Sequence, residues 1–446
     1  MKKVISKTWI LFLLVGVFFS SCEPSNNGGD QPNTNNDTIP VNGDWVRVYH
    51  PSDPDGLHPY ATRIAFANYI KENIFMYLCD LNPATNDLEP TLATGPCVIS
   101  EDGLQYTYEF IDEARWDNGD HITAEDYIFS MKCILNPLGE ATHMRNYYAD
   151  FIEDITIDPN NPKRFTTTIK QPFFLAESAI AVVDITSRNF YDPNHLLDDI
   201  SIQDFAKDPE ALVENENLKK FSEEFSTERV GRDPKMIYGS GPYKVESIAT
   251  GDKIVLVKKK DWWGEKLRGK AAYFTGYPEK IIYKTITDRS TLPAIARAEE
   301  VDVIRDMTPQ DFTEAREDTS GYIYKNYNFF TPPSYAFIYL GFNARPPAGR
   351  PAKLGDKRVR KAIAHLVDID RIINNVYAGY GVPQVGPISF MNKNEYNSDM
   401  KPVDFNPERS KELLDEAGWI DTDGNGIRDK VLKGKKEQLS LEIIIS

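Results

Sequence analysis

The sequence lacks the patterns that mark most enzymes. It has six histidines in 446 residues, and none of them stands in an H-E-x-x-H zinc motif. It has no G-x-S-x-G nucleophile elbow and no C-x-x-C pair, and its many carboxylates follow no spacing that singles out a catalytic pair. We therefore expect a protein that is not an enzyme, although catalytic residues far apart in the sequence would escape this argument.

Positive charge is also scarce. The chain carries 51 Lys and Arg against 67 Asp and Glu, which gives a formal net charge of −16. Binding to nucleic acid needs a basic face, so this balance argues against a nucleic-acid partner. The length predicts two or three domains.

A long apolar run is missing except at the N-terminus. Three lysines precede the apolar run 9–19, which is too short to span a bilayer and is typical of a signal peptide. Small residues stand directly before Cys22, so we predict a lipoprotein signal peptide over 1–22 with Cys22 acylated. An ordinary secretory signal with an incidental cysteine is the alternative. Residues 23–43 are almost devoid of apolar side chains and predict a flexible tether. The expected location is the periplasm or cell envelope, with a lipid anchor in a membrane.

Cysteine is rare, with four in the whole chain. Apart from Cys22, the three are Cys79, Cys97 and Cys133, so at most one internal bridge can form. An exported protein meets conditions that allow disulfides, and Cys79–Cys97 is the pair to test. Three reduced thiols are the alternative.

Local patterns predict several elements. Alternating apolar residues on both sides of the turn 250–252 predict a β-hairpin, and Thr123 with Asp126 predicts the capping box of a helix. Two strands are expected over 152–169. Further strands are expected over 322–327, 335–342 and 438–446, and a single long helix from Asp356 to the stop signal at Gly379.

One stretch has the composition of a calcium loop. Asp421, Asp423, Asn425 and Asp429 offer oxygen ligands at positions 1, 3, 5 and 9, and a glycine stands at position 6. Position 12 is Leu432, so the bidentate glutamate is missing. A structural calcium ion is one interpretation, and a turn stiffened by its own side-chain hydrogen bonds is the other.

Two segments resemble a known family. They are GSGPYKVESIATGDKIVLVKKKDWW (239–263) and DKRVRKAIAHLVDIDRIINNVYAGYGVP (356–383). Both are similar to signature segments of extracytoplasmic solute-binding protein family 5, the peptide/nickel class whose members serve ABC importers. The resemblance extends in ordered blocks from about residue 45 to the end.

The resemblance implies an α/β fold of the two-lobed periplasmic-binding-protein type (class II, cluster C), with mixed sheets and a hinge. It places lobe I at 44–285, with an inserted subdomain at about 86–160, and lobe II at 286–446. Family members usually continue further, so we expect the C-terminal part of lobe II to be missing. The ligand-binding residues that the resemblance suggests are Gly56, Leu57, His58 and Asn343.

The implied function is to bind peptides in the cleft and deliver them to a membrane permease and its ATPase, with a monomeric binding protein and no cofactor beyond the calcium. Two alternatives stay open. The same fold can bind another solute, such as an oligosaccharide or a metal chelate, or the chain can be a surface lipoprotein with a structural or adhesive role.

Overall fold

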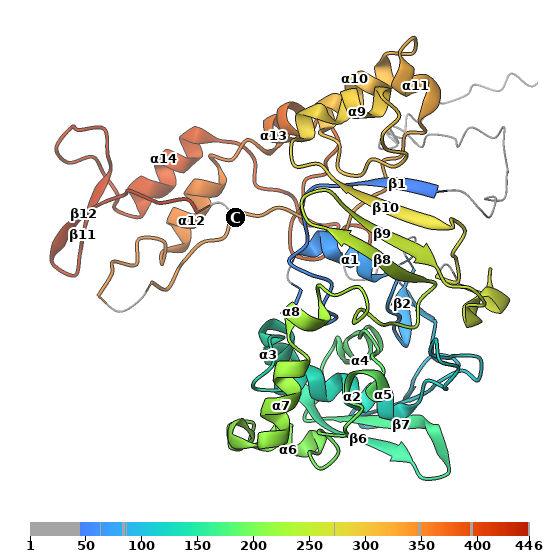
Figure 1. Cartoon of the computed structure of the whole chain (residues 1–446). Helices are drawn as coiled ribbons and strands as arrows, with labels where there is room; N and C mark the ends of the chain where they lie inside the picture. Colours follow the sequence, from blue (N-terminus) through green and yellow to red (C-terminus); the bar gives the residue numbers. More distant parts are fainter. Residues whose placement is uncertain are drawn as a thin grey trace, which may run out of the picture.

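The computed structural model describes residues 45–444 except 63, 83, 84, 86, 272, 347, 348 and 393–395. The predicted signal peptide, the tether and Cys22 lie outside the described residues. The chain forms two lobes of mixed α/β structure (Figure 1). The first contains two four-stranded sheets, and the second is mainly helical.

The central sheet of the first lobe has the order β1-β10-β9-β8. Its strands are β1 (Trp45–His50), β10 (Lys280–Thr285), β9 (Lys253–Lys258) and β8 (Tyr243–Ala249). β1 and β10 are parallel, and the other neighbours are antiparallel. Helix α1 (Ala65–Lys71) packs on this sheet, where Ile70 joins the strands in one apolar core. The parallel pair brings the first strand of the chain beside a strand more than 200 residues later.

The predicted hairpin is present as β8 and β9. In β8, Tyr243 and Val245 are buried and alternate with exposed residues, whereas three consecutive residues of β9 are buried, so that both faces of this strand are covered. The turn before β8 packs tightly on the residues after α1. Gly241 N donates to Ile74 O at 2.8 Å, and Tyr243 N donates to Asn73 O at 3.1 Å. The Gly-Ser-Gly-Pro segment therefore joins the hairpin to α1.

The second sheet has the order β4-β5-β7-β6 and forms the lower body in Figure 1. Its strands are β4 (Val98–Ile99), β5 (Gln105–Glu109), β7 (Asn161–Ile169) and β6 (Ile152–Asp158). The helices of this body are α2 (Ala124–Leu135), α3 (Thr142–Phe151), α4 (Ala176–Ala181), α5 (Arg188–Tyr191), α6 (Ile202–Lys207), α7 (Glu216–Glu224) and α8 (Thr227–Val230), with the short turn η1 (Ala211–Glu214). One large apolar core fills it and includes Phe221 and Val230. β7 and the later helices share this core with α2, and the predicted end of the inserted subdomain near residue 160 stays a prediction.

Two small elements border the first lobe. A hairpin of β2 (Cys79–Leu81) and β3 (Leu88–Pro90) leads from α1 toward the second sheet, and η2 (Trp263–Leu267) follows β9. Trp262 and Trp263 both donate through Nε1 to Ser240 O, at 2.8 and 3.1 Å. These bonds fix the end of the hairpin against the turn that begins it.

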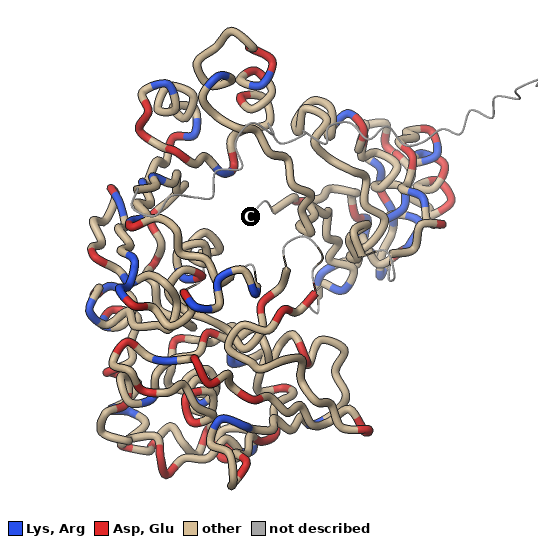
Figure 2. Tube along the Cα trace, turned by 90° about the vertical axis from the view of Figure 1, so that its right-hand side faces the viewer, with Lys and Arg blue, Asp and Glu red and all other residues tan. Residues whose placement is uncertain are grey.

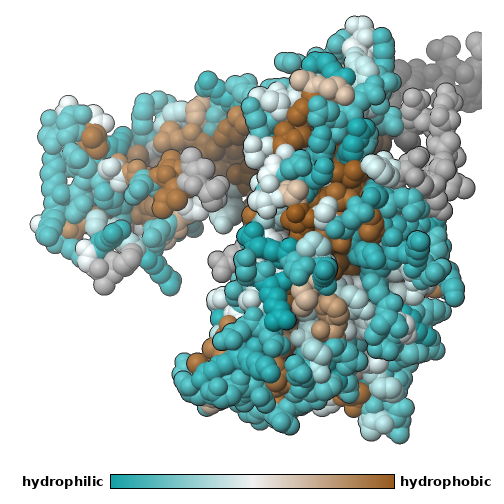
Figure 3. Space-filling view, in the orientation of Figure 1, coloured by the Kyte–Doolittle hydropathy of each residue, from teal (hydrophilic) through white to brown (hydrophobic). Residues whose placement is uncertain are grey.

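The second lobe starts after β10. It contains η3 (Arg289–Thr291), α9 (Leu292–Arg297), α10 (Pro309–Glu317), α11 (Tyr322–Asn326), α12 (Lys357–Ala364), α13 (Ile369–Val376), α14 (Pro407–Glu416), β11 (Asp429–Leu432) and β12 (Lys435–Gln438). α12 and α14 form an arm with the hairpin β11–β12 (Figure 1). Figure 3 shows apolar atoms exposed where this arm joins the rest of the molecule.

Four predicted elements of the second lobe are wrong. Residues 322–326 form helix α11, and residues 335–342 and 439–444 form no regular element. A strand exists only beside another strand, and none of the described strands pairs with 335–342. The predicted long helix is two helices, because Asp368 accepts a hydrogen bond from Arg371 N at 2.9 Å and starts α13 as its N-cap.

Candidate functional site

The loop after β1 lies at the carboxyl end of the parallel pair. His50 at the end of β1 is the register partner of Thr285 at the end of β10. In open α/β sheets, ligands bind in the crevice beyond the carboxyl ends of such strands. The predicted residues Gly56, Leu57 and His58 all lie in this loop, so the structure brings these three together.

Gly56 and Leu57 fix the path of this loop. Gly56 has a φ of +137°, which side-chain-bearing residues rarely adopt. Leu57 N donates to Gly231 O at 2.8 Å, and the Leu57 side chain is fully buried in the core beneath the central sheet. The loop is therefore attached to the end of α8 as well as to the sheet.

His58 is buried, with 3% of its surface exposed. Its Nδ1 accepts hydrogen bonds from Tyr60 N and Ala61 N, both at 3.1 Å, and its Nε2 donates to Phe225 O at 2.9 Å. This pattern fits the neutral ring. Burial lowers the pKa of His58 to about 4. Both ring nitrogens are thus used inside the protein, and contact between this ring and a ligand would require the loop to open.

Asn343 lies in the second lobe, exposed, in a segment without regular structure. Among the described residues, no backbone hydrogen bond joins Asn343 to the loop at Gly56. The roles of Gly56, Leu57, His58 and Asn343 in ligand binding stay predictions.

The predicted calcium loop joins α14 to β11. Carboxylate oxygens of Asp421, Asp423 and Asp429 lie within 4.8 Å of one another. Asp421 accepts hydrogen bonds from three backbone N–H groups of its own loop, at 2.8 to 3.1 Å. Asn425 Oδ1 accepts from Ile427 N at 2.8 Å.

A lysine already neutralises part of this loop. Lys436 Nζ lies 2.9 Å from Asp423 Oδ2 and 3.2 Å from Asp429 Oδ2. Thr422 Oγ1 also donates to the Asp429 carboxylate, at 2.7 and 2.8 Å. The loop is thus held by its own hydrogen bonds and an internal cation. Calcium binding stays a prediction, and isothermal titration with CaCl₂ would test it.

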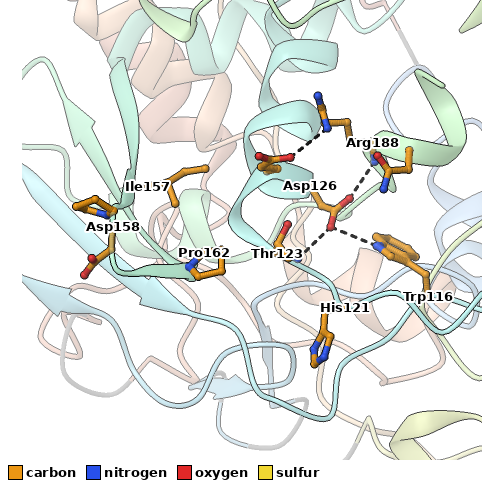
Figure 4. Close-up of a pocket in the computed structure, with 11 residues that line it drawn as sticks. Trp116, His121, Thr123, Asp126, Ile157, Asp158, Pro162 and Arg188 are labelled. Carbon is orange, nitrogen blue, oxygen red and sulfur yellow. Dashed lines mark hydrogen bonds and ion pairs between the residues drawn. The ribbon is translucent and has the colours of Figure 1, made fainter. Parts of the chain in front are cut away.

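A pocket of about 490 Å³ lies between the start of α2 and the β6–β7 turn (Figure 4). Asp126 lies at its back, 6% exposed, and burial raises the pKa of this carboxyl group to about 6. The Asp126 carboxylate accepts from Thr123 N at 3.0 Å, Arg188 N at 2.9 Å and Trp116 Nε1 at 3.2 Å. Arg188 in turn donates to Asp198 and Glu125. The bonds of Asp126 and Arg188 hold α2 against α5. Both side chains are therefore used within the protein, and we assign this pocket no ligand.

The sequence left open a Cys79–Cys97 bridge or three reduced thiols, and in the structure Cys79, Cys97 and Cys133 are all free thiols. Cys97 Sγ instead donates to Glu177 Oε1 at 3.4 Å. Burial raises the pKa of Cys79 to about 12 and that of Cys97 to about 11. Thiols of such high pKa contain little thiolate and react slowly with oxidants.

Comparison with known proteins identifies the class. Residues 87–445 match the family described as bacterial extracellular solute-binding proteins, family 5. This range covers most of the chain, so the chain belongs to that family. Members of this family are binding proteins and not enzymes, in agreement with the absence of catalytic motifs.

The relatives are distant. The oligopeptide-binding protein AppA of Bacillus subtilis is 23% identical over 437 residues, which are 97% of this chain and 69% of AppA. The dipeptide-binding protein of Escherichia coli is 23% identical over 385 residues, 82% of this chain and 62% of that protein. The chain thus spans roughly two thirds of the length of these relatives.

Solved structures share the two-lobed fold. AppA in complex with a nonapeptide aligns with a TM-score of 0.58 at 20% identity, over 89% of this chain and 68% of AppA. NikZ from Campylobacter jejuni, in complex with Ni(L-His), also gives a TM-score of 0.58, at 18% identity over 89% of this chain and 67% of NikZ. At this identity the likeness concerns the fold alone. Among the described residues, no helix is both long enough and apolar enough to cross a bilayer.

Proposed function

We propose that this chain is the ligand-binding component of an ABC importer and that it binds peptides between its two lobes. The observation that carries the proposal is the place where the chain passes from the first lobe to the second. β1 and β10 run parallel and end side by side, and the chain leaves β10 directly for the second lobe. A ligand bound beyond these strand ends would therefore border both lobes, and hinge closure would enclose it.

The peptide class is supported by the relatives, because AppA and the E. coli protein are named for oligopeptide and dipeptide binding. An extended peptide would be held mainly through its backbone, as in strand addition. Gly56, Leu57, His58 and Asn343 are the proposed contacts from this chain. The partners would be a membrane permease and its ATPase, and the binding protein would act as a monomer attached to the membrane through lipid on Cys22.

A metal chelate is the second candidate ligand. It is favoured by the fold likeness to NikZ, whose structure holds Ni(L-His). An oligosaccharide ligand and a structural role at the cell surface remain further alternatives from the sequence, with no structural observation in their favour.

Native mass spectrometry of the protein purified gently from its own host tests the ligand. We expect co-purifying masses that resolve into short peptides of mixed sequence. One defined mass with the isotope pattern of a metal would select the chelate instead. A protein without any added mass, and without a thermal shift in a peptide library, would contradict the peptide proposal.

The lipid anchor needs a separate experiment. We expect metabolic labelling with a fatty-acid probe to modify the protein, and Cys22→Ser to abolish both the label and membrane retention. Labelling that persists in the Cys22→Ser variant would contradict the assignment of Cys22.

A further inference from the structure

Lys71 and Asp184 form an ion pair in the interior of the first lobe. Lys71 is the last residue of α1, and its Nζ lies 2.9 Å from Asp184 Oδ2, with both side chains 8% exposed. Charged residues are spread along the whole chain (Figure 2), and pairs such as Lys280–Glu246 lie at the surface. Burying two charges removes them from water at a cost in free energy, so this pair needs a reason that a surface pair does not.

The lysine of this pair also binds the loop after β1. Lys71 Nζ donates to Pro59 O at 2.6 Å. Pro59 directly follows the predicted ligand-binding residues Gly56, Leu57 and His58. The φ angle of a proline is fixed, so this bond holds a segment of the loop that is already stiff.

Asp184 binds the same loop through its backbone. Tyr60 OH donates to Asp184 O at 2.7 Å and lies 2.9 Å from Thr186 Oγ1. Thr186 N donates to Ser130 Oγ of α2 at 2.9 Å, so the segment around Asp184 is attached to the body of the second sheet. Pro59 and Tyr60 are therefore held from two directions, by α1, which packs on the central sheet, and by a segment of the other body.

The pair is poorly suited to adding stability. Asp184 Oδ1 is buried without a hydrogen-bond partner among the described residues, whereas buried polar atoms nearly always have one. The cost of removing two charges from water can exceed their attraction, and two apolar side chains of similar volume are often as stable. Apolar side chains would not direct Pro59 O to one place, whereas the Lys71 ammonium group does, because a hydrogen bond is directional. What this pair supplies is therefore the position of the loop.

A fixed position matters for ligand binding at this loop. The loop follows the carboxyl end of β1, beside β10, where a ligand of an open α/β sheet binds. Residues 51–55 are half-buried, so a ligand can reach them, and their position depends on how the buried residues 56–61 are held. A loop that is already ordered loses little conformational freedom when a ligand binds, whereas a mobile loop must be ordered at a cost in affinity.

We propose that Lys71 and Asp184 are positioning residues for ligand binding, which fix the loop 51–61 in the form that a peptide ligand contacts. This inference rests on the proposed peptide-binding function and adds two residues that act without touching the ligand. The loop is set before the ligand arrives, so the pair raises the affinity for the ligand and not only the stability of the fold.

Hydrogen–deuterium exchange tests whether the pair fixes the loop. The double variant Lys71→Met/Asp184→Leu removes both charges together, so neither is left buried and unpaired, and Pro59 O loses its donor. We expect the amide groups of residues 57–61 to exchange about tenfold faster than in the wild type, with the exchange of β8 and β9 unchanged. Exchange of residues 57–61 at the wild-type rate would overturn the proposal.

Calorimetric titration with trialanine and tetraalanine tests whether the position of the loop matters for binding. We expect the double variant to bind these peptides about tenfold more weakly than the wild type, even where urea unfolding shows equal stability. If the pair had only a structural role, affinity would return to the wild-type value together with stability, and that result would overturn the proposal. A wild type that binds neither peptide would overturn peptide binding itself, whereas the exchange rates would still decide whether the pair fixes the loop.

A matched control removes a second buried lysine. Lys259 Nζ lies 2.7 Å from Asp117 Oδ1 and donates to Gly239 O at 2.5 Å, so it too joins a carboxylate to a backbone oxygen. Lys259→Met/Asp117→Asn should change neither the exchange of residues 57–61 nor the affinity for the two peptides. Changes as large as those in the first double variant would show that the effect is not specific to the pair and would overturn its role.

Tyr60→Phe keeps the proposal testable if the double variant does not fold. It removes the hydrogen bonds to Asp184 O and Thr186 Oγ1 with little change in volume. We expect faster exchange of residues 57–61 and weaker peptide binding than in the wild type. Wild-type values for both in Tyr60→Phe would overturn the proposal.

Discussion

His58 shows how burial decides the role of a residue. The imidazole is held neutral by burial, with a pKa of about 4 in the folded protein against an ordinary value near 6.5. The unfolded chain therefore takes up a proton as the pH falls below about 6.5, while the folded protein does not until about pH 4. The stability contributed by this group is present above pH 6.5 and is lost as the pH falls toward 4.

We expect the free energy of unfolding of the wild type to fall by up to about 3 kcal/mol between pH 6.5 and 4 because of His58. Urea unfolding at several pH values would measure this loss against His58→Asn, in which it should be absent. Glu72, Asp80 and Asp126 have raised pKa values and act in the opposite direction, so the difference between the two proteins is the useful quantity. His195→Asn is the control, because His195 is half-exposed and asparagine tolerates its φ of +58°. If the free energy of unfolding changed with pH in the same way in the wild type and in His58→Asn, the low pKa of buried His58 would be contradicted.

Gly239 and Gly251 separate two reasons for a glycine. A Cβ at Gly239 would lie 2.1 Å from Ile74 O, whereas a Cβ at Gly251 would meet nothing within 4 Å and only its φ of +77° opposes a side chain. We expect Gly239→Ala to lower the free energy of unfolding by about 3 kcal/mol or more, and Gly251→Ala by about 1 kcal/mol. Chemical denaturation of the two variants measures both. A similar loss of stability in both variants would show that the turn can move away from Ile74 with little loss in the free energy of unfolding.

Single residues could be assigned from the sequence only where the signal is local. Thr123 was predicted as the N-cap of a helix because the cap and its helix are adjacent in the chain, and the structure confirms it. The sequence gives no such signal where the surroundings of a residue come from distant parts of the chain. The buried state of His58 was also unpredictable, because Phe225 supplies its partner from 167 positions away.

At the scale of elements, hairpins with short turns could be predicted from the local sequence, whereas strands that need a distant partner could not. The β8–β9 and β6–β7 pairs have short turns, so each strand and its partner lie in one stretch of sequence, and both pairs were predicted. Residues 335–342 alternate and are rich in aromatics, yet Ile338 and Tyr339 are 79% and 75% exposed and no described strand pairs with them. Propensity alone does not satisfy the backbone of a strand.

Helix α2 offers a test at this scale, because it lies between the second sheet and α5. Its capping box uses the Thr123 side chain and the Asp126 carboxylate, and Asp126 also reaches Trp116 and Arg188. We expect Thr123→Ala to lower the free energy of unfolding by about 1 kcal/mol. Thr123→Ser keeps the capping hydroxyl and should lower the free energy of unfolding much less. Denaturant unfolding measures both, and an equal loss in the serine variant would show that the methyl group and not the cap is responsible.

The whole molecule is unevenly stabilised. The two large apolar cores belong to the first lobe, whereas the described part of the second lobe contributes only to two small ones, around Trp419 and around Leu292, and the latter includes Tyr49 of β1. The two-lobed arrangement itself followed from the resemblance to a family. Composition and periodicity could not supply it, because β1 and β10 pair across most of the first lobe.

Limited digestion with chymotrypsin should reveal this difference. Residues 328–346 contain no helix or strand, and Phe330, Phe337 and Tyr339 are 68%, 42% and 75% exposed. We expect the first cut within this segment, which would release a resistant fragment that contains the first lobe, identified by mass spectrometry. Replacing these three residues with serine should slow the first cut several-fold without changing the resistance of the first lobe.

Phe174 provides the internal control for this prediction. It is 88% exposed, more than any of the three target residues, but it lies in the short connection between β7 and α4. A protease must unfold several residues around the bond that it cuts, and on one side of Phe174 these include β7, which is paired with strands on both sides. Exposure alone would direct the first cut to Phe174, whereas local stability directs it to 328–346. Cleavage at Phe174 before the second lobe is cut would therefore contradict the uneven distribution of stability between the lobes.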